Sequence, residues 1–258
     1  MGVPQGGALS QLLFQVTLID MEEELRHTCN GVEVDWAGIA LKIWCLLFVD
    51  DVMVAADSPQ DLQRMMNVVA KWANRLRIRF NIGVAKSAIM PWGRGRMQRH
   101  CESLDFRLQG RIVPWTKRYK YVGLVLSVGG SWSGQLDHMQ QKAVRKTAEL
   151  VQWCTHFEIP LSRSEPLWKL YVETAAMFGA GVLTLTETQL ERLDRIQRKA
   201  GRLLMGHKST SPTPTIQSEL GWMPWSRRIV AERARLLARF ALQDEGYAKT
   251  LLAMTTSV

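Results

Sequence analysis

The sequence predicts an α+β protein, in which an antiparallel sheet with packed helices precedes a mostly helical region. In the first half, short apolar runs with β-branched residues alternate with turn signals and with one segment of helical periodicity, whereas the second half shows helical periodicity almost throughout. The glycines of Gly129-Gly130-Ser131 interrupt the pattern. We therefore predict two domains, 1–130 and 131–258.

The first domain is expected to open with a helix and two strands. The helix spans residues 10–26, and its acidic run Glu22-Glu23-Glu24 is expected to face solvent. Strands are expected over 31–34 and 39–48, and the second strand leads into a hairpin. The predicted apolar stripe of the helix consists of Leu12, Leu13, Val16, Ile19 and Leu25.

A second helix is expected from residue 59. Ser58-Pro59-Gln60-Asp61 combines a helix cap, a proline in the first turn and an acid three residues after the serine. Apolar residues then recur at helical spacing, so we expect them to form core against the sheet. These residues are Leu62, Met65, Met66, Val69, Trp72, Ala73 and Leu76.

Strands are then expected over 79–92 and 111–128, with a loop between them. Arg94 and Arg96 lie in this loop beside glycines and Trp92, a combination that favours contact with nucleic acid through charge and stacking. A solvated surface loop is the alternative interpretation.

The second domain is expected to consist of helices. Residues 136–153 are amphipathic, and residues 166–180 are apolar on nearly every side, which predicts a buried helix. Thr186 and Gln189 have the spacing of a capping box before a third helix, and residues 225–243 form the last one. Basic residues of the third helix are candidates for nucleic-acid backbone contact, with a solvated face as the alternative. They are Arg192, Arg195, Arg198, Lys199 and Arg202.

Two adjacent acids interrupt the apolar segment around residue 48. Asp50 and Asp51 follow the run Ile43 to Val49 and precede Val52 to Ala56, which predicts a β-hairpin with both carboxylates at the tip of a buried strand pair. Charges in such surroundings are costly unless a cation meets them, and Mg²⁺ prefers one or two carboxylates plus substrate phosphates. For the dipeptide by itself, a solvated turn is the alternative.

The opening of the chain supplies the context for these acids. Gly2 to Phe14 is a glycine-rich turn, whose backbone can approach a ligand closely, followed by an amphipathic run. Together with Phe48-Val49-Asp50-Asp51, it resembles the reverse transcriptase family, in particular the polymerases of non-LTR retrotransposons. Asn81 to Met90 and Tyr119 to Leu124 resemble later motifs of that family, in the expected order.

This resemblance implies transfer of deoxynucleotides from dNTPs onto a DNA primer paired with an RNA template. It implies a partial polymerase palm over 1–130 and a helical, thumb-like region over 131–258. In the family the acid hairpin carries catalytic metal, so Asp50 and Asp51 are the candidate catalytic residues and Mg²⁺ ligands. The candidate nucleotide and template contacts are Gly2, Pro4, Gln5, Gly6 and Lys86, and the candidate primer grip is Tyr121, Val122 and Gly123.

The sequence departs from the family pattern at its start. It begins inside the nucleotide-binding motif, so we expect an N-terminally truncated enzyme without the fingers and without the earlier palm strand, whose aspartate binds both metals in the family. Leu104-Asp105-Phe106 is a loose substitute that we expect to be a loop. Two metals about 3.5 to 4 Å apart need a bridging carboxylate. With Asp50 and Asp51 alone, we expect at most one weakly bound Mg²⁺ instead of two, and a fragment that is inactive by itself.

Charge and composition favour a nucleic-acid partner and argue against a membrane span. Residues 1–57 contain two basic and nine acidic residues, a formal −7, whereas residues 58–258 carry +16. No apolar run is long enough to cross a bilayer and no secretory signal is visible, so an intracellular protein is expected. The four cysteines lack paired spacing, which argues against a disulfide framework or a zinc site. The sequence does not indicate an oligomeric state.

Two classes of function therefore compete. The first is an RNA-directed DNA polymerase domain. The second is a non-catalytic nucleic-acid-binding protein, or a retrotransposon remnant, that keeps the same scaffold.

Overall fold

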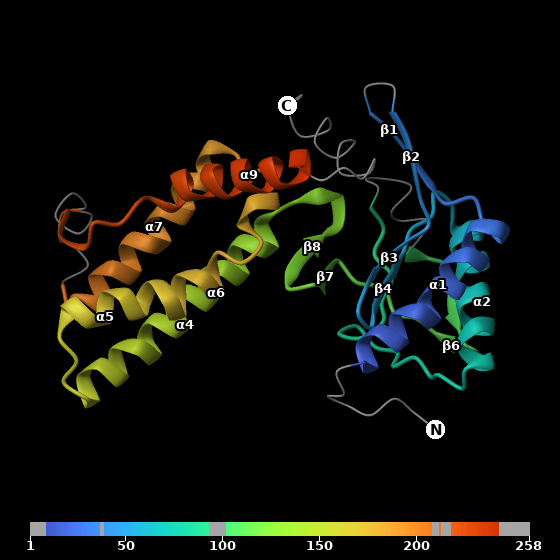
Figure 1. Cartoon of the computed structure of the whole chain (residues 1–258), viewed down its shortest axis with the longest axis horizontal. Helices are drawn as coiled ribbons and strands as arrows, with labels where there is room; N and C mark the ends of the chain where they lie inside the picture. The colour runs from blue at the N-terminus through green and yellow to red at the C-terminus, as the bar shows by residue number, and fades with distance from the viewer. Residues whose placement is uncertain (1–8, 37–38, 93–101, 208–211, 213–217, 243–258) are drawn as a thin grey trace. The chain divides into compact units, whose positions relative to one another are not determined.

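The computed structural model describes the chain except for residues 1–8, 37–38, 93–101, 208–211, 213–217 and 243–258. The described chain forms two compact units, each with its own hydrophobic core (Figure 1). Unit 1 consists of Met1–Val122 and Ser127–Gly130, and unit 2 of Gly123–Leu126 and Ser131–Val258. Helices combined with small antiparallel sheets confirm the α+β class. The palm and thumb assignments stay predictions.

Unit 1 contains two long helices, α1 (Ser10–Thr28) and α2 (Pro59–Arg75), which lie side by side (Figure 1). The predicted start of α2 is confirmed, because the Ser58 hydroxyl accepts the backbone N–H of Asp61 at 3.1 Å. Its predicted core face is also confirmed, except that Leu76 follows the helix and is 44% exposed. Leu62 is partly buried, and the fully buried members are Met65, Met66, Val69, Trp72 and Ala73.

The helix α1 was predicted correctly, but its buried face was not. The residues that pack toward the core are Leu18, Met21 and Leu25, beside the indole of Trp72, which donates to the Thr17 carbonyl at 3.1 Å. Four of the five predicted stripe residues are therefore wrong, because apolar residues occur on two faces of α1 and only one of them meets α2. The exposed four, each 51–56% exposed, are Leu12, Leu13, Val16 and Ile19.

The strand predicted over 39–48 is two strands. Strand β1 (Val32–Trp36) pairs antiparallel with β2 (Ile39–Ile43), and β3 (Cys45–Phe48) pairs antiparallel with β4 (Asp51–Val54). The break falls at Trp44, whose indole N–H donates to the Cys29 carbonyl at 2.9 Å. This bond turns the tryptophan toward the end of α1, so the chain changes partner strand at that residue.

The long strands predicted over 79–92 and 111–128 are also wrong. Residues 79–92 contain only isolated bridges and a turn. At the start of this segment, the amide side chain of Gln109 bonds the backbone of Ile78 at 2.8 Å and of Phe80 at 3.0 Å in place of a neighbouring strand. The second segment is divided among β6 (Arg111–Ile112), which pairs with β5 (Arg107–Leu108), β7 (Arg118–Tyr121) and β8 (Leu124–Ser127). A short 3₁₀ turn, η1 (Val128–Gly130), follows β8.

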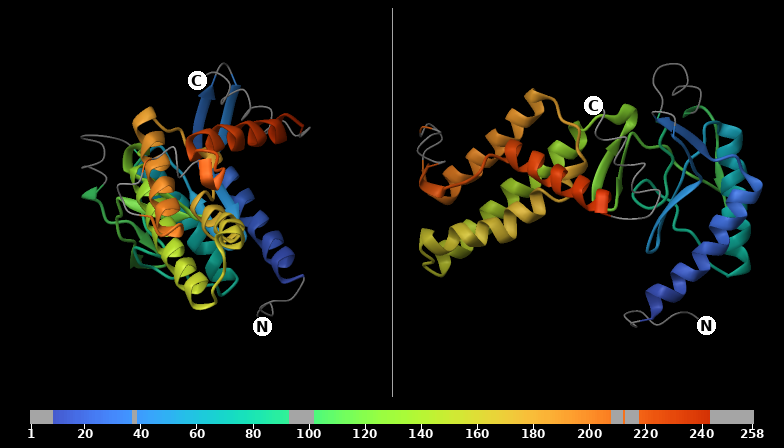
Figure 2. Two further views of the ribbon diagram at one scale, coloured as in Figure 1. Left: turned by 90° about the vertical axis from the view of Figure 1, so that its left-hand side faces the viewer. Right: turned by 45° about the horizontal axis from the view of Figure 1, so that its top comes forward.

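The described part of unit 2 is helical apart from most of β8, and the predicted helical character of residues 131–258 is confirmed where the structure describes them. The helices α4 (Ser133–His156) and α7 (Glu187–Leu204) pack along each other, and α9 (Trp225–Leu242) packs on α7 (Figure 2). The predicted capping box of α7 is confirmed, since the Thr186 N–H donates to the Gln189 side chain at 3.0 Å. Between α4 and α7 lie α5 (Leu161–Trp168), the π-helical turn η2 (Lys169–Glu173), α6 (Thr174–Ala176) and the 3₁₀ turn η3 (Ala180–Val182).

The segment 166–180 is buried on one side only, contrary to the prediction. Trp168, Val172 and Ala176 are buried, whereas Leu170 is 71% and Phe178 52% exposed. The π-helical turn η2 changes the angular spacing of the side chains, and Leu170 within it is exposed while Val172 is buried. None of the helices in the described residues is long and apolar enough to cross a membrane.

Candidate functional site

The acids Asp50 and Asp51 lie at the tip of a tight hairpin, as the sequence predicted. Phe48 pairs with Asp51, which leaves Val49 and Asp50 as the two-residue turn between β3 and β4. Both acids are exposed to solvent. The carboxylates are therefore available to a ligand, on a turn whose position is fixed by the strand pair.

The strand pair is half-buried rather than buried, which corrects the sequence prediction. Cys45, Leu47, Val52 and Val54 pack against the core of unit 1. On the opposite face, Leu46 is 45% and Phe48 is 53% exposed. Residues alternate between the two faces of a strand, so only one face of this hairpin meets the core.

The backbone of the hairpin turn adopts an unfavourable conformation. Val49 has φ = 57°, in the left-handed region that β-branched residues rarely adopt. Such backbone strain costs on the order of 1–3 kcal/mol and is concentrated at functional sites. The β7–β8 turn shows the same feature, with φ = 46° at Val122 followed by 83° at Gly123.

Two tyrosines of β7 lie close to the acid hairpin. The Tyr121 hydroxyl donates to the Leu46 carbonyl of β3 at 3.2 Å. Burial raises the pKa of both Tyr119 and Tyr121, and the negative charge of Asp51 raises each further. The strand predicted to be part of a primer grip is therefore next to the acid pair.

The predicted phosphate-binding residue Lys86 lies in a tight turn in the same unit. The backbone N–H groups of Lys86 and Ser87 both donate to the Gly83 carbonyl, at 2.8 and 2.9 Å. The Lys86 side chain is exposed, and its backbone carbonyl accepts the Tyr119 hydroxyl at 2.6 Å. Unit 1 thus brings the acid hairpin, the Lys86 turn and β7 into one neighbourhood.

The elements of this neighbourhood all fall within one match to a known family. The family model described as reverse transcriptase (RNA-dependent DNA polymerase) matches residues 1–126, which include the acid hairpin, the Lys86 turn and β7. Residues 1–126 belong to the reverse transcriptase family. Over 228 residues, 85% of this chain, the sequence is 23% identical to the RNA-directed DNA polymerase from mobile element jockey of Drosophila melanogaster. This chain spans about a quarter of the length of that relative, 23%. No solved structure matches the chain.

The donor atoms of the reverse transcriptase segment fit a hard divalent cation in part. Asp50 and Asp51 offer carboxylate oxygens, the ligands that Mg²⁺ prefers. Among the described residues, no group of three or more His, Cys, Asp or Glu side chains could hold a metal ion, and Asp105 lies exposed in a loop. Cys45 adds no ligand at neutral pH, because burial and then Glu22 raise the pKa of its thiol to about 11.

Several predicted site residues lie outside the part of the chain that the structure describes. These are Gly2, Pro4, Gln5 and Gly6 of the opening motif, together with Arg94 and Arg96, which were predicted to lie in a loop. Their roles stay predictions.

The glycine of the predicted primer grip has a steric role in unit 2. A Cβ atom on Gly123 would lie 2.7 Å from Cε1 of Phe178. Because its φ of 83° also favours glycine, both the turn and the packing require this residue. Tyr119 is the residue of this region that sequence reasoning did not assign, and its signal was the two-residue spacing from Tyr121.

The residues of α7 that were predicted to contact the nucleic-acid backbone differ in exposure and in whether they are already paired within the protein. Arg192 donates to Asp137 at 2.7 Å, and Arg198 donates to Glu191 at 2.6 Å, which together with the charge of Arg198 lowers the pKa of that glutamate. Arg202 is half-buried, whereas Arg195 and Lys199 are exposed. The last two are the best placed for contact with a phosphate backbone.

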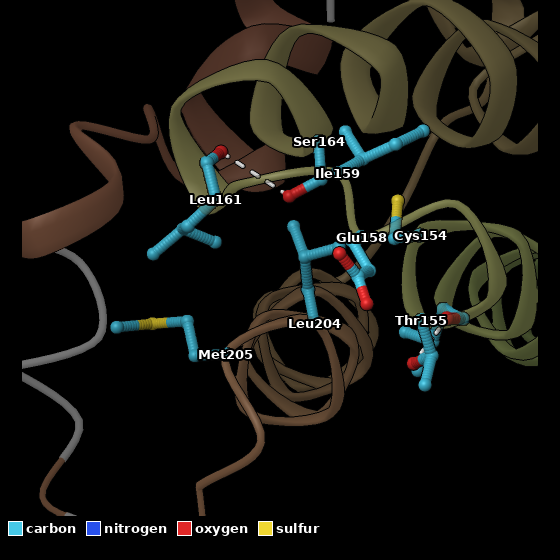
Figure 3. Close-up of a pocket in the computed structure, with 9 residues that line it drawn as sticks. Cys154, Thr155, Glu158, Ile159, Leu161, Ser164, Leu204 and Met205 are labelled. Carbon is cyan, nitrogen blue, oxygen red and sulfur yellow. Dashed lines mark hydrogen bonds between the residues drawn. The ribbon is translucent and has the colours of Figure 1, made fainter.

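Unit 2 contains a cavity of about 230 Å³ where the end of α4, the start of α5 and the end of α7 converge (Figure 3). Figure 3 shows the Cys154 thiol and the Glu158 carboxylate among apolar side chains. None of the predicted site residues that the structure describes lines it.

Proposed function

We propose that this chain is the nucleotide-joining part of an RNA-directed DNA polymerase of the non-LTR retrotransposon type. The observation that carries the proposal is the acid pair Asp50-Asp51, held at a hairpin tip within the segment that belongs to the reverse transcriptase family. In the proposed reaction, the 3′-hydroxyl of a primer paired with RNA attacks the α-phosphate of a dNTP and pyrophosphate leaves.

Each predicted catalytic or phosphate-binding residue that the structure describes has a role in this proposal. Asp50, at the free turn position, is the principal ligand of Mg²⁺, and Asp51, at the start of β4, is the weaker or structural ligand. A bound Mg²⁺ stabilises negative charge on the triphosphate and activates the attacking hydroxyl. Lys86 presents an exposed ammonium group to the leaving phosphates, because its turn lies beside the same strand β7.

The remaining predicted residues bind nucleic acid in the same scheme. Gly2, Pro4, Gln5 and Gly6 shape the nucleotide and template pocket, and the β7–β8 turn at Val122 and Gly123 supports the primer. Exposed cations of α7, Arg195 and Lys199, contact the phosphate backbone, and Arg94 and Arg96 are predicted to make contacts of the same kind.

The described residues supply two carboxylates, which limits what the chain does alone. A two-metal site needs a carboxylate between its ions, since the two charges repel strongly. We infer that the acid hairpin holds at most one Mg²⁺ weakly, and that full activity needs a third carboxylate from outside the described residues. This chain alone is then expected to extend primers slowly or not at all.

Primer extension on an RNA template tests the proposal, with Mg²⁺ binding measured by calorimetry on the same samples. Asp50→Asn should abolish any extension and weaken Mg²⁺ binding, whereas Asp105→Asn removes another exposed acid and should change neither. Extension that survives Asp50→Asn contradicts the assignment of the site. Unchanged Mg²⁺ binding in Asp50→Asn contradicts the metal role even where the wild-type chain is inactive.

A non-catalytic nucleic-acid-binding protein is the second candidate. It is favoured by the two-carboxylate set of the described residues and by the basic balance of the later chain. Binding of an RNA–DNA hybrid, measured by fluorescence anisotropy, separates the candidates. Binding without any effect of Mg²⁺ or of Asp50→Asn favours this second candidate.

A further inference from the structure

Two tyrosines on one face of β7 bond two different segments of unit 1. Tyr119 and Tyr121 are two residues apart and both half-buried, so they share a face of the strand. Tyr121 donates its hydroxyl to the backbone of the acid hairpin, and Tyr119 donates its hydroxyl to the Lys86 carbonyl at 2.6 Å. After burial, the negative charge of Asp51 is the next cause that raises the pKa of both hydroxyls.

We propose that Tyr119 is a positioning residue, whose hydroxyl holds the Lys86 turn beside the Asp50-Asp51 tip so that the ammonium group and the carboxylates meet one triphosphate. This inference rests on the proposed function of the acid pair. It assigns to Tyr119 a role that differs from primer contact, because the hydroxyl is already engaged by the protein backbone.

The turn around Lys86 needs such an anchor. Within residues 83–87, the turn is closed by bonds to Gly83 alone, and Val84 is 55% exposed. The bridge between Gly83 and Ser87 is isolated, and the next backbone anchor is the bridge between Ile89 and Trp115, two residues after the turn. The Tyr119 bond is made at Lys86 itself, and it therefore sets the place from which the lysine side chain extends.

The chain offers a matched control for this bond. Tyr119→Phe and Tyr121→Phe each remove one oxygen and keep the ring and its packing. Because the Tyr121 hydroxyl bonds Leu46 of β3 instead of the turn, only Tyr119→Phe should release Lys86. Neither substitution alters the acids or the lysine.

Hydrogen exchange and nucleotide binding together test the inference on the whole chain. Tyr119→Phe should speed exchange of the Lys86 and Ser87 amides by about fivefold, the expected effect of one lost hydrogen bond, and Tyr121→Phe should not. The affinity for Mg²⁺–dATP should fall by a similar factor in Tyr119→Phe. In a Lys86→Met background, adding Tyr119→Phe should cost nothing further.

Each contrary result contradicts one specific step of the inference. Unchanged exchange in Tyr119→Phe means that the hydroxyl does not hold the turn. An equal loss of affinity in the Lys86→Met background means that Tyr119 acts by another route. If the wild-type chain binds no Mg²⁺–dATP, the proposed function and the nucleotide role both fall, while the exchange rates separately report whether the hydroxyl holds the turn.

Discussion

In the described part of unit 2, six buried side chains are polar or charged, whereas the described part of unit 1 buries one such residue, Ser127. The six all have hydrogen-bond partners: Asp194 accepts from the Ser226 N–H at 2.9 Å, and Gln197 from the Trp225 N–H at 3.1 Å. These bonds fix the start of α9 against α7. Unit 1 instead packs apolar side chains and keeps its polar groups at the rim, which is where its candidate site lies.

This difference shows which interactions determine the packing of each unit. Buried polar groups tolerate only one arrangement of partners, so they define the helix packing of unit 2. The core of unit 1 relies more on shape and pattern, supplemented by indole bonds such as that of Trp72 to the Thr17 carbonyl. The exposed acids and lysine of unit 1 are then available to a ligand, because none of them is required to satisfy the core.

The largest expected effect is the loss of the central tryptophan of unit 2. Trp168 stacks on Trp222 with ring centroids 3.8 Å apart, and its indole N–H donates to Thr147 at 2.9 Å. Trp168→Ala should lower the free energy of unfolding by about 3–5 kcal/mol, measured by denaturant titration with circular dichroism. Trp153→Ala removes a 48% exposed tryptophan and should cost less than about 1 kcal/mol. Equal losses would mean that the tryptophan cluster is not the core of unit 2.

The buried carboxylate of unit 2 gives the next largest effect. Glu173 is 3% exposed, and it accepts hydrogen bonds from the Trp225 indole, at 2.8 Å, and from Arg228. Glu173→Gln keeps the size but leaves the guanidinium without its counter-charge, which should cost about 2 kcal/mol in the same titration. Glu191→Gln breaks an exposed pair and should have no measurable effect. A neutral result for Glu173→Gln would remove the argument that polar contacts specify this unit.

The thiol of Cys45 makes unit 1 sensitive to alkaline pH. Burial keeps the folded-state pKa at about 11, above the unfolded value, so the unfolded chain loses this proton first as pH rises. Stability should therefore fall between pH 9 and 11, by about 1 kcal/mol once partial exposure is taken into account. Cys45→Ala should flatten the pH dependence over that interval, and Cys154→Ala, which removes a thiol from unit 2, should not. An unchanged slope in Cys45→Ala would show that the thiol is well solvated.

Local signals in the sequence predicted the helices and the acid hairpin. Three such signals are the Ser58 cap, the capping box at Thr186 and the turn after Phe48. Each depends on residues close together in the sequence, so it can be recognised without knowledge of the rest of the chain. The buried face of α1 was not predictable in this way. Apolar residues lie on two of its faces, and only the position of α2 decides which one is covered.

Contacts between distant residues were also beyond the sequence pattern. The amide of Gln109 replaces a strand partner for residues 78–80, and the hydroxyl of Tyr119 reaches Lys86. Neither contact leaves a periodic signature, because each joins one side chain to one backbone group. The candidate site was therefore predicted as a set of residues, whereas the links among them came from the fold.

The smallest expected effect concerns the strain at the acid hairpin. Val49 at φ = 57° should be relieved by Val49→Gly, which we expect to stabilise the chain by about 0.5–1 kcal/mol, after the entropic cost of glycine in the unfolded chain. Val52→Gly, within strand β4, should destabilise it instead.

Measuring Mg²⁺ affinity in Val49→Gly then decides whether the strain serves the site. The turn residue next to Val49 is Asp50, so a valine forced into this conformation restricts the directions that the carboxylate can take. If the variant is more stable but binds Mg²⁺ more weakly, the strain orients the Asp50 carboxylate for metal binding and lowers the stability of the fold. If stability rises and affinity stays the same, the carboxylates are placed by the strand pair alone, and unit 1 keeps the valine for a reason other than metal binding.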